Sequence, residues 1–381
     1  MSQHPLRAAM TDRLPQVIAD IEALVTCESP SADLAAVAAS ADVAAAAGQR
    51  LLGVAPERIV ADGRPHLRWR LGDRPSRVLL LGHHDTVWPL GSLATHPYSA
   101  SDGVLRGPGC FDMKTGVIMA LHAIAALGSP AGVTILVTAD EEIGSPTSRG
   151  LIEEAAAGCR AALVLEASAD GGALKTARKG TSIYRVHAAG KAAHAGLEPE
   201  KGVNASLELA RQLLAVERLA DPGRGTTVTP TVLAAGTTLN TVPASGEFGV
   251  DVRMWDDAEQ QRVDADMRAL RAALPGAALE VTGGPNRPPL AAGASAALFD
   301  RAAGLAAGLG LGPLAQAAVG GASDGNFTAG IGTPTLDGLG AVGGGAHADH
   351  EHVLAGEIPG RLALLAALVG DLLGDEPGGA A

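Results

Sequence analysis

The sequence predicts an α/β protein with two domains, a discontinuous main domain and a smaller α+β domain inserted into it. In the first half of the chain, short runs of Val, Ile and Leu alternate with segments of helical periodicity, which is typical of a mostly parallel sheet flanked by helices. From about Gly180 this pattern gives way to a different order of strands and helices. The length of 381 residues also exceeds the usual size of one domain.

The main domain is predicted to comprise residues 1–179 and 289–381. Its expected strands are short apolar runs, because strands buried on both faces need no polar alternation. They lie at 78–82, 133–138, 161–165 and 333–336. Its expected helices have apolar residues spaced by three and four positions. They lie at 10–25, at 35–52, just after Asp112, and at 147–157, 294–307 and 357–373.

The inserted domain is predicted to comprise residues 180–288. Its strands and helices follow the order β-α-β-β-α-β, which is the ferredoxin-like arrangement. The expected strands lie at 181–188, 226–235, 246–254 and 278–281, and the expected helices at 203–216 and 258–274.

Composition and charge narrow the class of partner. The formal net charge is −12, which argues against nucleic acid or an anionic membrane surface as a partner. No stretch has the apolar density of a membrane span, and the first residues lack the pattern of a signal peptide, so we expect a cytoplasmic protein that acts on a small molecule. The cysteines Cys27, Cys110 and Cys159 are too scattered for a thiolate metal site.

Five acidic and two histidine side chains follow short apolar runs, and this placement points to a metal site. In open α/β sheets, binding sites form at the carboxyl ends of the strands. Carboxylates gathered there would repel one another unless cations lay among them, and imidazoles beside carboxylates are typical metal ligands. The seven residues are His83, Asp85, Asp112, Glu141, Glu142, Glu166 and His347.

Each motif also has an ordinary structural explanation when taken alone. Asp85 shares a strand face with His83 and can orient its ring, but a surface histidine beside a capping aspartate has the same spacing. Glu141 and Glu142 point in different directions, so one can ligate while the other acts as a base, although adjacent acids are most often a solvated charge run. Glu166 ends an apolar strand and needs a partner there. The carboxyl-terminal loop offers three candidate ligands, His347, His350 and His352.

Six segments in this order resemble the M20 family of dinuclear zinc metallopeptidases, and most closely its glutamate carboxypeptidase branch. They are LLLGHHDTV, GPGCFDMKTG, TADEEIGS, LVLEAS, KAAHAG and GAHADHEHV. The resemblance covers nearly the whole chain, including the inserted domain. It implies a zinc-dependent hydrolase that cleaves the amide bond of an N-acyl amino acid, or releases the carboxy-terminal amino acid of a small peptide or conjugate.

Carried over by position, the resemblance implies a ligand set for two zinc ions, with Co²⁺ or Mn²⁺ as alternatives. Asp112 would bridge the two metals. His347 and Glu142 would complete one of them, and His83 and Glu166 the other.

The resemblance also implies catalytic and substrate-binding roles. Glu141 would be the general base and Asp85 would orient the neighbouring histidine ligand. His194, in KAAHAG of the inserted domain, would steady the oxyanion, usually across a dimer interface. Asn240 and Arg253 would help to hold the substrate and its free carboxylate, for which a guanidinium fork is well suited.

In the implied mechanism, the two metals would activate a water, and Glu141 would take a proton from this water as it attacks the amide carbonyl. The inserted domain is expected to act as a lid and to mediate a homodimer. The family also tends to have a cis peptide bond after the bridging acid, here Asp112–Met113. Glutamate preference stays open, because several residues stand where a substrate-binding lysine is expected: Lys175, Arg178 and Lys179.

Two other interpretations remain. The segment GASDG matches the nucleophile-elbow pattern of α/β-hydrolases, with Ser323 as nucleophile and Asp337 and His347 following in the usual order. Such a metal-independent serine hydrolase would leave the upstream carboxylates without a purpose. The other is a catalytically inactive metal-binding scaffold, against which the presence of Glu141, not needed as a ligand, argues.

Overall fold

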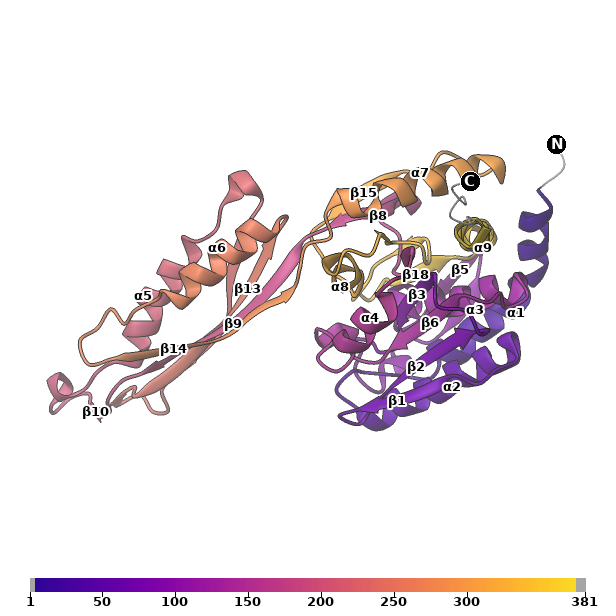
Figure 1. The fold of residues 1–381 in the computed structure, drawn as a ribbon. Coiled ribbons are helices and arrows are strands. Elements are labelled where there is room, and N and C mark those ends of the chain that lie inside the picture. Colours follow the sequence, from indigo (N-terminus) through magenta and orange to yellow (C-terminus); the bar gives the residue numbers. More distant parts are fainter. Residues whose placement is uncertain (1–3, 375–381) are drawn as a thin grey trace. The chain divides into compact units, whose positions relative to one another are not determined.

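The computed structural model describes residues 4–374. Its chain divides into two compact units (Figure 1). The main unit comprises Met1–Ala177, Ala291–Val319 and Ser323–Ala381, and the inserted unit comprises Arg178–Leu290 together with Gly320–Ala322. None of the helices within the described residues is long and apolar enough to cross a membrane.

The main unit is built on a six-stranded sheet with the strand order β1-β2-β6-β3-β7-β16. The four strands from β6 to β16 are parallel, whereas β2 runs antiparallel to β6 and β1 antiparallel to β2. The strands are β1 (Glu57–Ala61), β2 (Arg64–Leu71), β3 (Val78–His83), β6 (Val133–Thr138), β7 (Ala161–Val164) and β16 (Thr335–Leu336). The predicted α/β fold with a mostly parallel sheet is therefore confirmed.

Helices cover both faces of this sheet, which explains the continuous apolar runs of its central strands. Leu80 of β3 belongs to a large core with the helices on one face, while Leu79 and Leu81 pack with Ile152 and Phe327 on the other. The helices are α1 (Pro5–Val25), α2 (Leu34–Leu52), α3 (Thr115–Ala126), α4 (Arg149–Ala156), α7 (Ala292–Gly308), α8 (Gly325–Gly330) and α9 (Ile358–Gly374). Each of the predicted helices of the main domain is present.

The sequence did not predict the antiparallel edge of this sheet. β1 carries one arginine and β2 three, and neither strand is a continuous apolar run. The predicted strand 333–336 is also shorter, since only Thr335 and Leu336, after Pro334, pair with β7. A proline has no backbone N–H to donate to a ladder, so the strand begins after it.

Two small sheets of the main unit were also not predicted. One has the order β17-β18-β5-β4 and places the segment of His347 beside the segment of Asp112. Its strands are β4 (Ser99–Ser101), β5 (Val104–Arg106), β17 (Gly343–Gly344) and β18 (His352–Leu354). The other pairs β8 (Leu174–Arg178) with β15 (Gln316–Val319).

The inserted unit has a four-stranded antiparallel sheet in the order β11-β13-β9-β14. Its core joins apolar residues of the strands, such as Val186 and Phe248, to Leu209 and Val263 of the two helices. Figure 1 shows both helices alongside the sheet. The elements are β9 (Gly180–Ala189), β10 (Ala193–His194), α5 (Ala205–Glu217), β11 (Thr227–Ala235), β12 (Thr241–Val242), β13 (Ser245–Met254), α6 (Asp257–Arg268) and β14 (Ala278–Arg287).

The helix predicted over 258–274 was too long, because α6 ends at Arg268. The carboxylate of Glu208 accepts the backbone N–H groups of Ala273 and Leu274. These N–H groups are thus taken out of the helical ladder, and Pro275 follows directly. The strand predicted over 278–281 was too short, since β14 pairs with β9 as far as Arg287.

Candidate metal centre

Three of the candidate residues lie at the carboxyl ends of neighbouring parallel strands. β3 ends at His83, Glu142 lies in the short turn Glu141–Ile143 beyond the end of β6, and Glu166 follows β7. The order β6-β3-β7 in the sheet makes these three ends neighbours. The strand ends therefore gather these side chains at one edge, as the sequence indicates.

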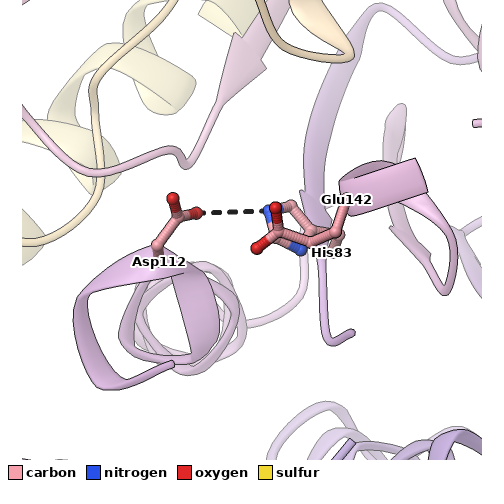
Figure 2. Close-up of side chains that lie close together, drawn as sticks. All are labelled: His83, Asp112 and Glu142. Carbon is pink, nitrogen blue, oxygen red and sulfur yellow. Dashed lines mark ion pairs between the residues drawn. The ribbon is translucent and has the colours of Figure 1, made fainter. Parts of the chain in front are cut away.

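Asp112 reaches this edge from a separate turn. The segment Cys110–Lys114 forms a kinked turn directly before α3, with non-helical backbone angles at Asp112 and Met113, and the peptide bond Asp112–Met113 is cis. The cis bond expected from the family resemblance is thus confirmed. Figure 2 shows the side chains of Asp112, His83 and Glu142 close together, with the aspartate on this turn.

The carboxylate of Asp112 lies between two histidines. Its Oδ1 is 3.4 Å from Nε2 of His83, and its Oδ2 is 3.2 Å from Nε2 of His347. Each histidine also faces a second acid. Nε2 of His347 is 3.2 Å from Oε2 of Glu142, and Nε2 of His83 is 3.6 Å from Oε1 of Glu166. One oxygen of Asp112 thus faces the pair His83 and Glu166, and its other oxygen faces the pair His347 and Glu142.

Without a cation, protons must balance this concentration of acids. Hydrogen bonds to Asp112 and Glu142 raise the pKa of His347 to about 10. Burial works to lower the pKa of His83, but the carboxylates of Asp112, Asp85 and Glu166 raise it well above its usual value. Burial likewise opposes ionisation of Asp112, yet the two histidines hold its pKa far below the usual range.

Two buried polar atoms in this cluster have no well-aligned hydrogen-bond partner within the described residues, Nε2 of His83 and Oε1 of Glu142. A buried polar atom without a partner is costly unless something else satisfies it. There are also two sets of potential ligand atoms, and within each set all atoms lie within 4.8 Å of one another. The sets are His83 with Asp112 and Glu142, and His83 with Glu141 and Glu166. Nitrogen and carboxylate donors at this spacing fit divalent ions such as Zn²⁺.

Asp85 connects one histidine to the acidic turn. Nδ1 of His83 lies 3.0 Å from the backbone oxygen of Asp85 and 3.4 Å from its carboxylate, so the backbone oxygen is the nearer partner. The carboxylate itself accepts hydrogen bonds from Ser31 and from the backbone N–H groups of Glu141 and Glu142. Asp85 thus positions both the ring of His83 and the pair Glu141 and Glu142. The sequence predicted only its role in orienting the ring.

One buried acid beside the centre was missed by sequence reasoning. Glu351 is 3% exposed and accepts hydrogen bonds from the turn that carries Asp112. The available signal was its place directly before the strand that begins at His352, within a loop already marked by His347. The sequence did not predict this role, because the histidines of the same loop are the more typical metal ligands.

The remaining candidates, His194, Asn240 and Arg253, belong to the inserted unit. The backbone N–H of Ala195 donates to the backbone oxygen of Asn240, which places His194 and Asn240 on adjacent segments. Nδ1 of His194 accepts the backbone N–H groups of Gly196 and Leu197. The neutral ring therefore carries its proton on Nε2, and the side chain is exposed.

Arg253 already has a carboxylate partner within the inserted unit. Its Nε and Nη2 each donate to an oxygen of Asp251 at 2.8 Å, which is a bidentate pair. Only the Nη1 edge of the guanidinium lacks a hydrogen bond among the described residues.

The structure gives no support to Ser323 as a nucleophile. Its side chain is fully buried, and its Oγ donates to the carboxylate of Asp337 at 2.6 Å. His347, the expected base, faces Asp112 and Glu142 instead. Ser323 therefore lacks the histidine base that this interpretation assigned to it, and its burial leaves it no access to a substrate.

A parallel sheet with histidines and carboxylates at its strand ends is the architecture of an α/β metallohydrolase. Comparison with known proteins agrees with this class. Residues 79–371 match the family described as "Peptidase family M20/M25/M40". Carboxypeptidase G2 of Pseudomonas sp. (strain RS-16) is 33% identical over 383 residues, covering 96% of this chain and 91% of that protein.

Two further comparisons cover shorter or more distant relatives. Succinyl-diaminopimelate desuccinylase 2 of Shewanella loihica is 35% identical over 203 residues, which are 48% of this chain and 54% of that protein. The M20 family metallo-carboxypeptidase Sso-CP2 of Sulfolobus solfataricus shares the fold, with a TM-score of 0.74 and 15% identity over 93% of this chain and 98% of that one. The chain belongs to peptidase family M20/M25/M40. It is a hydrolase of a metal-dependent family, as the sequence predicts.

Proposed function

We propose that this protein is an amidohydrolase that uses two zinc ions to release an amino acid from a small peptide, an N-acyl amino acid or a related conjugate. The observation that carries the proposal is the bridging position of Asp112. Its two oxygens face two different histidines, and each histidine has an acid of its own. Asp112, His347 and Glu142 would hold one ion, and Asp112, His83 and Glu166 the other.

When bound, two such ions supply a nucleophile at neutral pH and Lewis-acid activation of the scissile carbonyl. The chain's own part in the reaction is proton transfer and positioning. Glu141 is not needed for the ligand set, and Asp85 holds its backbone N–H at 3.2 Å. We assign Glu141 as the general base that takes a proton from the attacking water and delivers it to the leaving amine.

Three residues of the inserted unit complete the proposed site. Nε2–H of His194 is available to donate to a developing oxyanion, because Nδ1 is occupied by backbone N–H groups. Arg253 offers its Nη1 edge to the carboxylate of the released amino acid, and Asn240 assists in binding. In this proposal the inserted unit also serves as a lid that excludes water.

The inserted unit itself supports a homodimer. β10, with His194, and the segment of Asn240 adjoin the end of the sheet at which Ser245 begins β13, whereas Arg253 lies eight positions further on. Eight residues of strand span about 27 Å, but a dipeptide reaches only about 7 Å. One substrate cannot touch both ends of one inserted unit, so we propose that His194, together with the adjacent Asn240, acts in the site of a second copy.

The substrate class follows from the relatives and from the proposed carboxylate grip. Carboxypeptidase G2 is by name a carboxypeptidase, and the Shewanella relative is by name a desuccinylase. Removal of a carboxy-terminal amino acid and removal of an acyl group are both amide hydrolyses beside a free carboxylate. We therefore propose N-acyl amino acids and dipeptides as substrates, with no preference assigned to glutamate.

The first test is release of free amino acid from a panel of N-acyl amino acids and dipeptides, before chelation, after chelation and after Zn²⁺ is restored. Zinc-restorable release is expected. Activity that survives full removal of metal would refute the proposal. Glu141→Gln should retain both metals, measured by elemental analysis, while losing about 10²- to 10⁴-fold in activity. An inactive wild type that binds metal would favour the scaffold interpretation.

Mixing two inactive variants tests the dimer. His194→Ala and Glu141→Gln homodimers are each expected to lack activity. After subunit exchange, half of the dimers are mixed, and each mixed dimer has one intact site, so about a quarter of wild-type activity should return. Exchange is verified with a mass-tagged copy. Mixed dimers without recovered activity would rule out action of His194 in the partner's site.

A further inference from the structure

Glu351 lies where two segments of the metal centre meet. It ends the loop that connects β17 to β18, and the same loop carries His347. β18 pairs with β5, and β5 leads into the turn that carries Asp112. The carboxylate of Glu351 thus lies between the turn that carries Asp112 and the loop that carries His347.

The carboxylate of Glu351 accepts four hydrogen bonds. Its Oε1 accepts the backbone N–H groups of Phe111 and Asp112 at 2.8 and 3.0 Å. Its Oε2 accepts the backbone N–H of Gly109 at 3.0 Å and the indole N–H of Trp88 at 2.7 Å. An ionised carboxylate has about four acceptor sites and no donor, so this environment of four donors matches its chemistry.

The other end of Glu351 fixes the histidine loop. Its backbone N–H donates to the backbone oxygen of Ala348, next to His347. Within the loop, Gly345 has φ 78°, and a Cβ there would lie 2.9 Å from the backbone nitrogen of Glu351. The loop is therefore tightly closed around Glu351. His347 itself is 49% exposed, so the loop rather than core packing must hold its ring near Asp112.

We propose that Glu351 is a positioning residue that joins the Asp112 turn to the His347 loop and so assembles the bridging side of the metal centre before any metal binds. It contacts neither substrate nor metal in this role. The inference rests on the proposed dinuclear function. It goes further by assigning part of the metal affinity to a buried acid that is not a ligand, since outer partners of ligands typically contribute about 10- to 100-fold.

The inserted unit offers a matched control in Glu208. This carboxylate is also fully buried and accepts the backbone N–H groups of Ala273 and Leu274 and the side-chain amide of Gln212. Glu208→Gln and Glu351→Gln each replace an acceptor oxygen with an NH₂ group that faces donors. Both should lower the free energy of unfolding, but only the second disturbs the metal centre.

The experiment measures binding of Zn²⁺ and Co²⁺ to the metal-free full-length protein by chelator competition, together with the visible absorption of the Co²⁺ form. For Glu351→Gln we expect about 10- to 100-fold weaker binding of at least one ion and an altered Co²⁺ spectrum. Glu208→Gln should match wild type in both. A Glu351→Gln protein with wild-type affinity and spectrum would overturn the inference.

If Glu351→Gln does not fold, Trp88→Phe decides the question, because it removes one of the four donors and keeps an aromatic ring. A loss of about threefold or more in metal affinity would support the positioning role, and unchanged affinity would contradict it. Wild-type protein that binds no pair of metals would instead refute the proposed function. The two failures are therefore distinguishable.

Discussion

Metal binding should release about two protons at pH 7. In the metal-free protein the pKa of His347 is about 10, and the pKa of His83 is raised well above its usual value by the surrounding carboxylates. Both imidazoles are then protonated at pH 7, whereas two histidines with ordinary pKa values would together hold only about half a proton. A metal ligand must be unprotonated, so each histidine gives up its proton on binding.

This difference in bound protons makes metal affinity depend on pH, and the released protons can be counted. Because protons compete with the metal, affinity should rise with pH from neutrality to about pH 10, where His347 becomes neutral on its own. Titration calorimetry in buffers of different ionisation enthalpy counts the released protons. His347→Gln should release about one proton fewer. Release of half a proton or less by the wild type would refute the assigned protonation of the cluster.

Three further changes test other parts of the structure. In Gly116→Ala the new Cβ would lie 2.0 Å from the backbone oxygen of Leu165, so the free energy of unfolding should fall by about 1 to 3 kcal/mol in a denaturant titration. Glu259 has its pKa lowered to about 2, mainly by hydrogen bonding to an arginine; its contribution to stability is present above pH 4.5 and is lost as pH falls from 4.5 to 2. Glu259→Gln should lower the free energy of unfolding at pH 7 by about 2 kcal/mol. This value is smaller than the pKa shift alone implies, because the arginine partners are partly exposed to solvent. The variant should also lose most of this dependence of stability on acid pH. Arg253→Lys should raise KM with little change in kcat, and an unchanged KM would argue against the carboxylate grip.

The elements that the sequence predicted best are those with one strong physical cause. β3, β6 and β7 are buried on both faces, so their apolar runs are unbroken. The edge strand β1 and its neighbour β2 have no such run, and their pairing depends on a neighbour that the local sequence does not identify. The end of α6 depends on Glu208, about 60 residues earlier in the chain. Long-range partners of this kind are not visible in local periodicity.

The same distinction separates the parts of the site. His83 and Glu166 follow from their strand ends, and Asp112 from its place before a helix. The pair Arg253 and Asp251 was not anticipated, although the two residues lie side by side on one strand. Their relation depends on side-chain rotamers, and the strand pattern specifies only that both point to the same face.

Two buried carboxylates anchor the proposed centre. Asp85 joins His83 to the turn of Glu141 and Glu142 through backbone N–H groups. Glu351 joins the turn of Asp112 to the loop of His347. Both anchors are buried carboxylates, because only an ionised acid accepts several N–H donors while needing none itself. Asp112 connects the two anchored segments, because one of its oxygens faces His83 and the other faces His347. A change in either anchor should therefore weaken metal binding even though every ligand is retained.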